Sequence, residues 1–351
     1  MTKPKAFRVA LSGTFQSGDG EPVFPMFDLA PLASDPDIEF SYVPGVDGRM
    51  TGESLDDFDA LVLLLEKFDA DSIPRSGRLA LVTRFGVGYD TVDVPACTAA
   101  GIAVGITPDG VRRPVATAIL TYILALAGKL MAKDALVRGG PESFARRSDH
   151  MGTGLVGRTL GVVGLGNIGA ELARICAPLD MRLIAHDPYI DPRSARAINV
   201  ELTDLETVFR ESDFLSVSVP LSADTRHLVN ASRLQLMKST AFLINTSRGP
   251  VVDQHALVEA LKTGIIAGAG LDVFEPEPPE ADDPLLTLDN VILSPHALCW
   301  TDQCFAGIGA QDLEHVFSIK RGTPPSVLVD PDVVNNSKFQ TKLERCRINF
   351  S

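Results

Sequence analysis

The sequence predicts an α/β fold with two doubly wound domains, each built on a parallel β-sheet. Three observations predict this fold. The chain has 351 residues, more than one hydrophobic core usually organises. Short apolar runs alternate with helix-length segments, and this alternation is typical of βαβ units. A glycine-rich turn at residues 164–169 follows one apolar run and opens an amphipathic segment.

The first part of the chain contains four apolar runs of strand length. We expect strands at residues 7–11, 60–65, 79–83 and 101–106. The residues Pro108-Asp109-Gly110 then predict a turn. An apolar stretch from about Pro114 to Val137 predicts a long helix.

The pattern is clearer from Leu160 onward. We expect six strands, at residues 160–163, 182–185, 214–219, 241–244, 266–271 and 291–293. Residues 168–179 place their apolar side chains on one helical face. The prediction is a six-stranded domain at 108–297, inserted between residues 1–107 and 298–330 of the other domain. Residues 331–351 are set apart as a polar C-terminal tail.

Composition excludes several classes of function. A net charge of −13 argues against nucleic-acid binding, which needs a basic face. The most apolar run, Ile119 to Ala127, is too short to span a membrane, and no signal peptide is recognisable, so we expect a cytoplasmic protein. The five cysteines are scattered. His296, Cys299 and Cys304 lie close in sequence but lack a fourth ligand at a familiar spacing, so no metal is expected.

The turn Gly164-Leu165-Gly166-Asn167-Ile168-Gly169 fits the pattern GxGxxG and follows a strand, which is the context that a dinucleotide site requires. A second match at residues 152–157 follows polar residues and is discarded. Asp187 ends the next strand, where a carboxylate accepts hydrogen bonds from ribose hydroxyls and repels a 2′-phosphate. These features favour NAD over NADP, although Asp187 alone is also compatible with a solvated turn residue.

An arginine, a glutamate and a histidine follow strands of the same predicted sheet, where ligands of such sheets bind. Arg248 can clamp a carboxylate with two hydrogen bonds. His296 has an imidazole suited to proton transfer near neutral pH, and Glu277 can orient that ring. Taken singly, each of the three also fits a solvated surface residue. We expect the other histidines at positions 150, 227, 255 and 315 to lack partners, and His186 to be structural.

The chain resembles the D-isomer-specific 2-hydroxyacid dehydrogenases over about residues 60–320. The matching segments are Arg84 to Asp90, Gly161 to Gly169, His186 to Tyr189, Val219-Pro220-Leu221 with Thr225, Asn245 to Gly249, Gly270 to Phe274, and Ser294-Pro295-His296. The resemblance implies a Rossmann cofactor domain inserted in a discontinuous, flavodoxin-like substrate domain. It also implies a homodimer, paired through the cofactor domain and the helix at 114–137.

The same resemblance assigns roles to residues. Arg248, Glu277 and His296 would be catalytic, with Glu277 preferred to Glu275 because the family places the acid directly before the proline that corresponds to Pro278. Backbone N–H groups around Val87 and Gly88 would hold the substrate carboxylate. Asp272 would lie near the nicotinamide. The expected cofactor contacts are Gly164, Gly166, Asn167, Ile168, Gly169, Asp187, Pro220, Thr225, Thr246, Ser247 and Asp272.

Two departures from the family pattern bear on specificity. Arg112 and Arg113 replace a more usual acidic helix start, and they would either face the cleft and favour an anionic substrate or be solvated. Trp300 stands where a small turn is more usual, so we expect it to shape the substrate pocket with Val87 and residues 43–50.

The leading hypothesis is an NAD(H)-dependent enzyme that interconverts a small D-2-hydroxy acid and its 2-keto acid. One alternative keeps the scaffold and changes the substrate. Phosphite would suit the same three residues, whereas the formate enzymes carry glutamine where Glu277 stands. A second alternative is an NADH-responsive binding protein that resembles the corepressors built on this scaffold.

Overall fold

The computed structural model describes residues 6–350 and divides the chain into two compact units. One unit combines Met1–Val111 with Thr301–Ser351, and the other is Arg112–Trp300. The junctions fall a few residues later than we expected, so Trp300 ends the second unit instead of belonging to the first. We describe each unit by itself.

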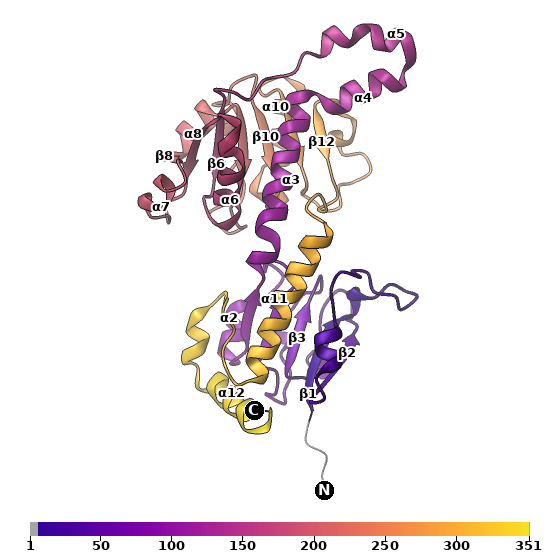
Figure 1. Cartoon of the computed structure of the whole chain (residues 1–351), viewed down its shortest axis with the longest axis vertical. Coiled ribbons are helices and arrows are strands. Elements are labelled where there is room, and N and C mark those ends of the chain that lie inside the picture. The colour runs from indigo at the N-terminus through magenta and orange to yellow at the C-terminus, as the bar shows by residue number, and fades with distance from the viewer. Residues whose placement is uncertain (1–5, 351) are drawn as a thin grey trace. The chain divides into compact units, whose positions relative to one another are not determined.

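The first unit contains a five-stranded, fully parallel sheet in the order β2-β1-β3-β4-β5. This strand order is the flavodoxin-like order, as predicted. The strands are β1 Phe7–Ser12, β2 Ile38–Val43, β3 Ala60–Leu63, β4 Leu81–Arg84 and β5 Ala103–Ile106. The sequence did not predict β2, an edge strand in which polar and apolar residues mix. The long helix α11 (Asp302–Lys320) packs on β3, β4 and β5 (Figure 1).

The residues that we set apart as a tail belong to this first unit. They form the short helix η8 (Pro331–Asn335) and α12 (Ser337–Phe350), which packs on α11. Phe339 on α12 is fully buried, and the Lys342 ammonium donates to the carbonyls of Leu79, Ala100 and Gly101 at 2.7, 2.9 and 2.9 Å. This segment is polar in composition, but it forms a helix that packs on the first unit.

A cluster of three buried polar side chains lies between α11 and β4. Thr83 Oγ1 donates to Asp312 Oδ1 at 2.5 Å and lies 2.9 Å from His315 Nδ1. All three side chains are fully buried. Burial raises the pKa of Asp312 to about 7, although the hydrogen bond from Thr83 and the charge of Arg84 partly oppose the rise. His315 was expected to lack a partner, and that prediction is wrong.

The second unit contains a seven-stranded parallel sheet in the order β12-β11-β10-β9-β6-β7-β8. The strands are β6 Thr159–Val163, β7 Arg182–His186, β8 Glu201–Leu202, β9 Phe214–Val217, β10 Phe242–Asn245, β11 Gly268–Leu271 and β12 Val291–Leu293. The six predicted strands are confirmed, and the two-residue β8 was missed. The strand order reverses between β6 and β9, the position at which such sheets bind ligands beyond their carboxyl ends.

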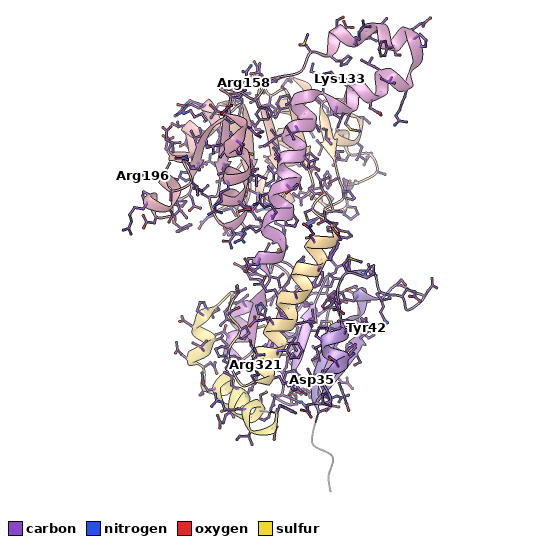
Figure 2. The ribbon with its side chains drawn as sticks, in the orientation of Figure 1. Asp35, Tyr42, Lys133, Arg158, Arg196 and Arg321 are labelled. Carbon is purple, nitrogen blue, oxygen red and sulfur yellow. The ribbon has the colours of Figure 1, made fainter. Side chains whose placement is uncertain are left out.

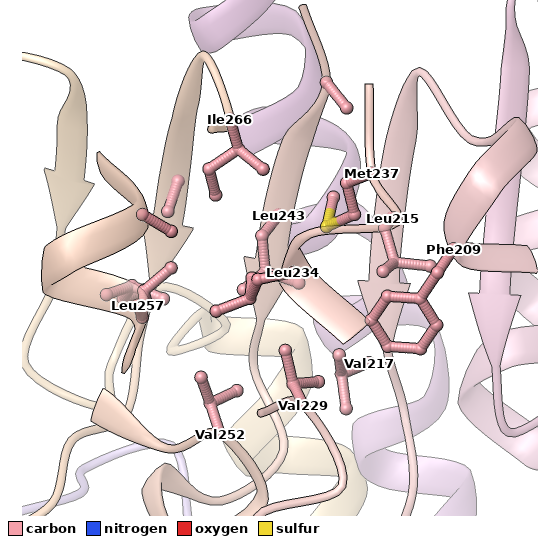
Figure 3. Packing of buried hydrophobic residues seen from close by; sticks show 14 of the residues in the cluster. Phe209, Leu215, Val217, Val229, Leu234, Met237, Leu243, Val252, Leu257 and Ile266 are labelled. Carbon is pink, nitrogen blue, oxygen red and sulfur yellow. The ribbon is translucent and has the colours of Figure 1, made fainter. Parts of the chain in front are cut away.

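Helices follow most of these strands. The predicted amphipathic helix is α6 (Asn167–Cys176), which continues into η5 (Ala177–Leu179). Four further helices of this unit lie after β7: α7 Pro192–Arg196, α8 Leu205–Glu211, α9 Ala231–Leu234 and α10 Gln254–Lys262. Two short helices of the first unit are α1 Ala30–Ser34 and α2 Val94–Ala99. Figure 3 shows the apolar core of the second unit, in which Phe209, Leu215 and Leu243 are fully buried.

The predicted long helix is in fact two helices with a break. Helix α3 begins at Pro108 and ends at Gly128, so Pro108-Asp109-Gly110 forms its first turn and not a separate loop. A proline is well tolerated at the first helical position because no N–H is needed there. Lys129 adopts a left-handed backbone (φ 50°), and α4 (Leu130–Arg138) and α5 (Gly140–Ala145) follow it. They project from the body of this unit, with Lys133 exposed on α4 (Figures 1 and 2).

Among the described residues, α3 is the one helix whose length and apolar composition would allow it to cross a membrane. Half of its most apolar window is buried inside the protein, as is usual for the core helix of a globular domain.

Candidate active site

The glycine-rich turn between β6 and α6 owes its shape to three glycines with different functions. Gly164 has a left-handed φ of 93°, and a Cβ there would lie 2.5 Å from the Ser218 carbonyl oxygen. A Cβ at Gly169 would lie 2.2 Å from the carbonyl oxygen of Gly164, so the first turn of α6 packs directly on the loop. At Gly166 a Cβ would meet nothing within 4 Å. The backbone is thus closed on the protein side and open at Gly166, which suits a pyrophosphate at the helix N-terminus.

Asp187 is held against this turn. Its Oδ2 accepts the N–H of Leu165 at 2.8 Å, and its Oδ1 accepts the N–H of Tyr189 at 2.9 Å. The carboxylate therefore stands at the end of β7 in one fixed orientation. Each oxygen keeps a second lone pair, which is available to a ribose hydroxyl.

The two arginines at the start of α3 have different surroundings. Arg113 forms an ion pair with Glu171 at 2.7 Å. Arg112 lines a hollow of about 250 Å³ beside Gly166 and Asn167, together with Arg174. Within this unit, one arginine is therefore paired with α6 and the other lies beside the glycine-rich turn, so neither is simply solvated.

Four more of the expected cofactor contacts, Pro220, Thr225, Thr246 and Ser247, follow β9 and β10, which are neighbours in the sheet. Thr225 Oγ1 donates to the Pro220 carbonyl at 2.6 Å, which folds the loop after β9 back on itself. Ser247 Oγ donates to Asn245 Oδ1 at 2.8 Å, and Thr246 lies between them in the sequence. Loops that present hydroxyl groups thus follow both strands.

Glu277 and His296 are in direct contact. The distance between Oε1 of Glu277 and Nδ1 of His296 is 2.5 Å, which leaves the Nε2 atom for proton exchange with a ligand. Glu275 instead pairs with Arg226 and with His227 Nε2, the latter at 2.9 Å. The geometry therefore selects Glu277 as the carboxylate beside His296. His227 was expected to lack a partner, and that prediction is also wrong.

The electrostatics of Glu277 favour its ionised form. Burial raises the pKa of Glu277, but the hydrogen bond and charge of His296, the Phe274 N–H at 3.3 Å and the charge of Arg248 outweigh burial, so the net shift is downward. The carboxylate is thus negative at neutral pH and favours a positively charged imidazole beside it.

The backbone at His296 is left-handed, with φ 54°. Such a conformation costs a residue other than glycine about 1–2 kcal/mol, so the surrounding structure must hold it. Asp272 Oδ1 accepts the N–H groups of Ala297 and Leu298 at 3.0 and 3.3 Å, and it also accepts the Ser294 hydroxyl. Asp272 therefore fixes the turn that carries the histidine.

Arg248 follows β10 in an extended conformation, φ −142°. Its carbonyl accepts the Asn245 side-chain N–H at 3.0 Å, and its Nη1 donates to the Ser247 carbonyl at 2.8 Å. The charge of Arg248 contributes to the lowered pKa of Glu277. The guanidinium and the Glu277–His296 pair therefore belong to one electrostatic site, beyond the adjacent strands β10, β11 and β12.

The expected substrate loop follows β4 in the first unit. Gly86 has a φ of 125°, and its N–H donates to Thr107 Oγ1 at 2.9 Å. Phe85 is buried, whereas Val87 and Gly88 are half-exposed. Trp300 is 53% exposed at the end of the second unit. In residues 6–350, no three His, Cys, Asp or Glu side chains are grouped so that they could hold a metal ion.

Sequence reasoning missed Tyr122 on α3 and the role of Ser294. The Tyr122 hydroxyl donates to the Leu271 carbonyl at 3.0 Å and lies 2.9 Å from Ser294 Oγ. A tyrosine within an apolar helical stretch gives one signal, because a buried hydroxyl needs a partner, but the sequence does not say which.

Comparison with known proteins gives a consistent picture. Residues 120–297 match the family model described as D-isomer specific 2-hydroxyacid dehydrogenase, NAD binding domain. A glyoxylate reductase of Korarchaeum cryptofilum is 42% identical over 284 residues, or 80% of this chain and 86% of that protein. The glyoxylate reductase of Thermococcus litoralis is 38% identical over 81% of this chain and 87% of its own length. The crystal structure of a glyoxylate reductase from Paecilomyes thermophila superposes with a TM-score of 0.78 at 26% identity, covering 93% of this chain and 99% of that one.

Proposed function

Because this chain belongs to the D-isomer specific 2-hydroxyacid dehydrogenase family, we propose that it reduces a small 2-keto acid, with glyoxylate as the first candidate, to the 2-hydroxy acid. The contact between Glu277 and His296, beyond the strands that follow the glycine-rich turn, is the observation that carries this proposal. Glyoxylate is chosen because the relatives named above are glyoxylate reductases.

The nicotinamide dinucleotide would lie across the carboxyl ends of β6 and β9. The backbone around Gly166 would bind its pyrophosphate, and Asp187 its adenosine ribose. We propose NADH as the preferred form because a 2′-phosphate would meet the fixed negative charge of Asp187. When bound, the reduced cofactor supplies the hydride that the C2 carbon of the keto acid accepts.

Arg248 would bind the substrate. A guanidinium offers two parallel N–H groups, which match the carboxylate and the adjacent carbonyl oxygen of a 2-keto acid.

His296 would supply the proton. As hydride reaches C2, negative charge develops on the carbonyl oxygen, and the Nε2 proton of the imidazolium moves to that oxygen. The products would be a 2-hydroxy acid, the oxidised cofactor and a neutral imidazole. Glu277 stabilises the imidazolium before the transfer and keeps the ring oriented through Nδ1. In the oxidative direction His296 would accept the proton from the hydroxyl group.

The test is a substrate panel followed through the loss of NADH absorbance. We expect turnover of glyoxylate or a close homologue such as hydroxypyruvate, and none after His296→Gln. A protein that binds NADH but reduces no keto acid in the panel would contradict the proposal. Phosphite with NAD⁺, and partner binding with and without NADH, are the two arms that test the alternative functions.

We further propose that the chain forms a homodimer through α4, α5 and the segment after them. Apolar side chains there are about half or more exposed, and burial of these side chains against a second copy would stabilise a dimer. They are Leu130, Met131, Val137, Phe144 and Met151. Light scattering should give twice the chain mass, and Met131→Glu should shift the population toward monomer. A monomeric wild-type protein would contradict this assignment.

A further inference from the structure

We infer that Tyr122 is a positioning residue for His296, because its hydroxyl connects helix α3, through Ser294, to the carboxylate that holds the histidine turn. This inference rests on the proposed function of His296. It adds a residue to the three that sequence reasoning assigned to the chemistry.

The packing of Tyr122 places its ring against the end of a strand. The side chain is 1% exposed, and a Cβ at Gly270 would lie 2.6 Å from Tyr122 ring atoms. Gly270 therefore leaves the space in which the ring lies on β11. The hydroxyl reaches the last residue of that strand, Leu271, whose carbonyl accepts at 3.0 Å.

A chain of hydrogen bonds continues from this hydroxyl to the turn. Tyr122 Oη lies 2.9 Å from Ser294 Oγ, and Ser294 Oγ donates to Asp272 Oδ1. The same oxygen of Asp272 accepts the N–H groups of Ala297 and Leu298. Ser294 precedes His296 in the sequence and these two N–H groups follow it. The chain of hydrogen bonds therefore ends at the turn that carries His296, whose backbone is left-handed.

The hydrogen bonds donate in one direction, from Tyr122 through Ser294 to Asp272. Ser294 gives its one proton to Asp272, so the Tyr122 proton is shared between the Leu271 carbonyl and Ser294 Oγ. Burial raises the pKa of Tyr122 from its ordinary value near 10, so the hydroxyl keeps this proton throughout any practical assay range. A phenylalanine would fill the same space and supply no donor.

The experiment is therefore Tyr122→Phe in the full chain, with Ser294→Ala as a second variant. Removing one such hydrogen bond should lower kcat about two- to tenfold, while KM for NADH stays nearly constant. The pH profile of kcat should shift as well, because the ring that donates the proton is less well held. Thr121→Val is the matched control, since its hydroxyl bonds only to the Thr117 carbonyl on the exposed side of α3.

Two further measurements make the test decisive. If Tyr122 acts through Ser294, the double variant should lose little more than the stronger single variant, whereas additive losses would overturn the inference. The midpoint of the His296 ring titration, followed by NMR and assigned with His296→Gln, should change in Tyr122→Phe but not in Thr121→Val. An unchanged midpoint together with an unchanged kcat would also overturn it.

The NMR titration needs no turnover. If the wild-type protein reduces no keto acid, the proposed function fails, yet the ring titration still decides whether Tyr122 positions His296. The two failures are therefore distinguishable.

Discussion

The carboxylate of Glu277 approaches the imidazole of His296 to 2.5 Å across 19 residues of sequence, because neighbouring parallel strands deliver both side chains to one edge of the sheet. The negative charge of Glu277 thus lies beside the His296 ring that is proposed to carry the proton. Glu277→Gln keeps the shape and removes the charge. We expect kcat for keto acid reduction to fall by about 10²-fold. The alkaline limb of the pH profile should move to lower pH, because the protonated ring has lost its stabilising partner.

The control for this variant is Glu280→Gln, which removes an exposed carboxylate from the same loop. Equal losses in the two variants would show that loop charge, not contact with His296, matters. Because the pKa of Glu277 is lowered in the folded state, its ionised carboxylate stabilises the fold. This stabilisation is present at pH values above the ordinary pKa of a glutamate and is lost as the pH falls through the lowered pKa.

Arg248→Lys should not preserve normal activity. A lysine keeps the positive charge but cannot present two parallel donors. We expect kcat/KM for the keto acid to fall about 10- to 150-fold, in line with about 1.5–3 kcal/mol for a charged hydrogen bond. Affinity for NADH, measured by fluorescence titration, should change little. Near-normal kcat/KM in Arg248→Lys would argue against bidentate binding.

The glycine-rich turn offers a matched pair of alanine variants. Gly166→Ala adds a methyl group where nothing lies within 4 Å, so the melting temperature should hold while NADH binding weakens about tenfold. Gly169→Ala places a Cβ 2.2 Å from the Gly164 carbonyl oxygen, so it should destabilise the fold by about 1–3 kcal/mol. Calorimetry and NADH titration separate the two effects. Identical behaviour of the variants would contradict the assigned geometry.

Asp187→Asn tests cofactor choice. The amide oxygen can still accept an N–H group from the glycine-rich turn, but the charge that would repel a 2′-phosphate is gone. The ratio of kcat/KM for NADPH over NADH should rise about tenfold, or about 1.4 kcal/mol. If the wild-type protein already uses both cofactors equally, Asp187 does not discriminate.

The raised pKa of buried Asp312 should make the stability of the first unit depend on pH. Its pKa is raised from 3.8 to about 7 in the folded state, so the folded chain binds more protons between these values. Stability from this group is therefore present below its unfolded pKa and is lost as the pH rises through about 7. Asp312→Asn mimics the neutral acid, and its melting temperature should exceed that of the wild type increasingly from about pH 5 to about pH 7. A constant difference would contradict this assignment.

Much of the fold follows from local patterns. Six of the seven strands of the second sheet were recognisable because buried parallel strands are short apolar runs, and the glycine-rich turn follows one of them. The missed strands, β2 and β8, lie at sheet edges, where one side is unpaired and polar residues are tolerated. The docked helix α12 was missed because the segment is polar overall and its buried face, Phe339, Lys342, Leu343 and Cys346, includes a lysine.

The site was predictable to a similar degree. Strand ends locate Arg248 and His296, since parallel strands present their carboxyl ends at one edge. The strand-end pattern alone did not distinguish Glu277 from Glu275, because only one residue lies between them in the same loop; the preference for Glu277 came from the family resemblance. The partners of Tyr122 and His315 depend on packing between distant segments, which periodicity does not describe. The left-handed backbone at His296 likewise has no signature in its side chain.

The discontinuity of the first unit has a consequence for biosynthesis. The segment that becomes the second unit is contiguous and leaves the ribosome complete before the last helices have been made. The first sheet, by contrast, must wait for α11 and α12, whose buried side chains and Lys342 ammonium complete its packing. Until translation ends, strands β1 to β5 remain without this cover, and this nascent domain is the one that a chaperone would have to shield.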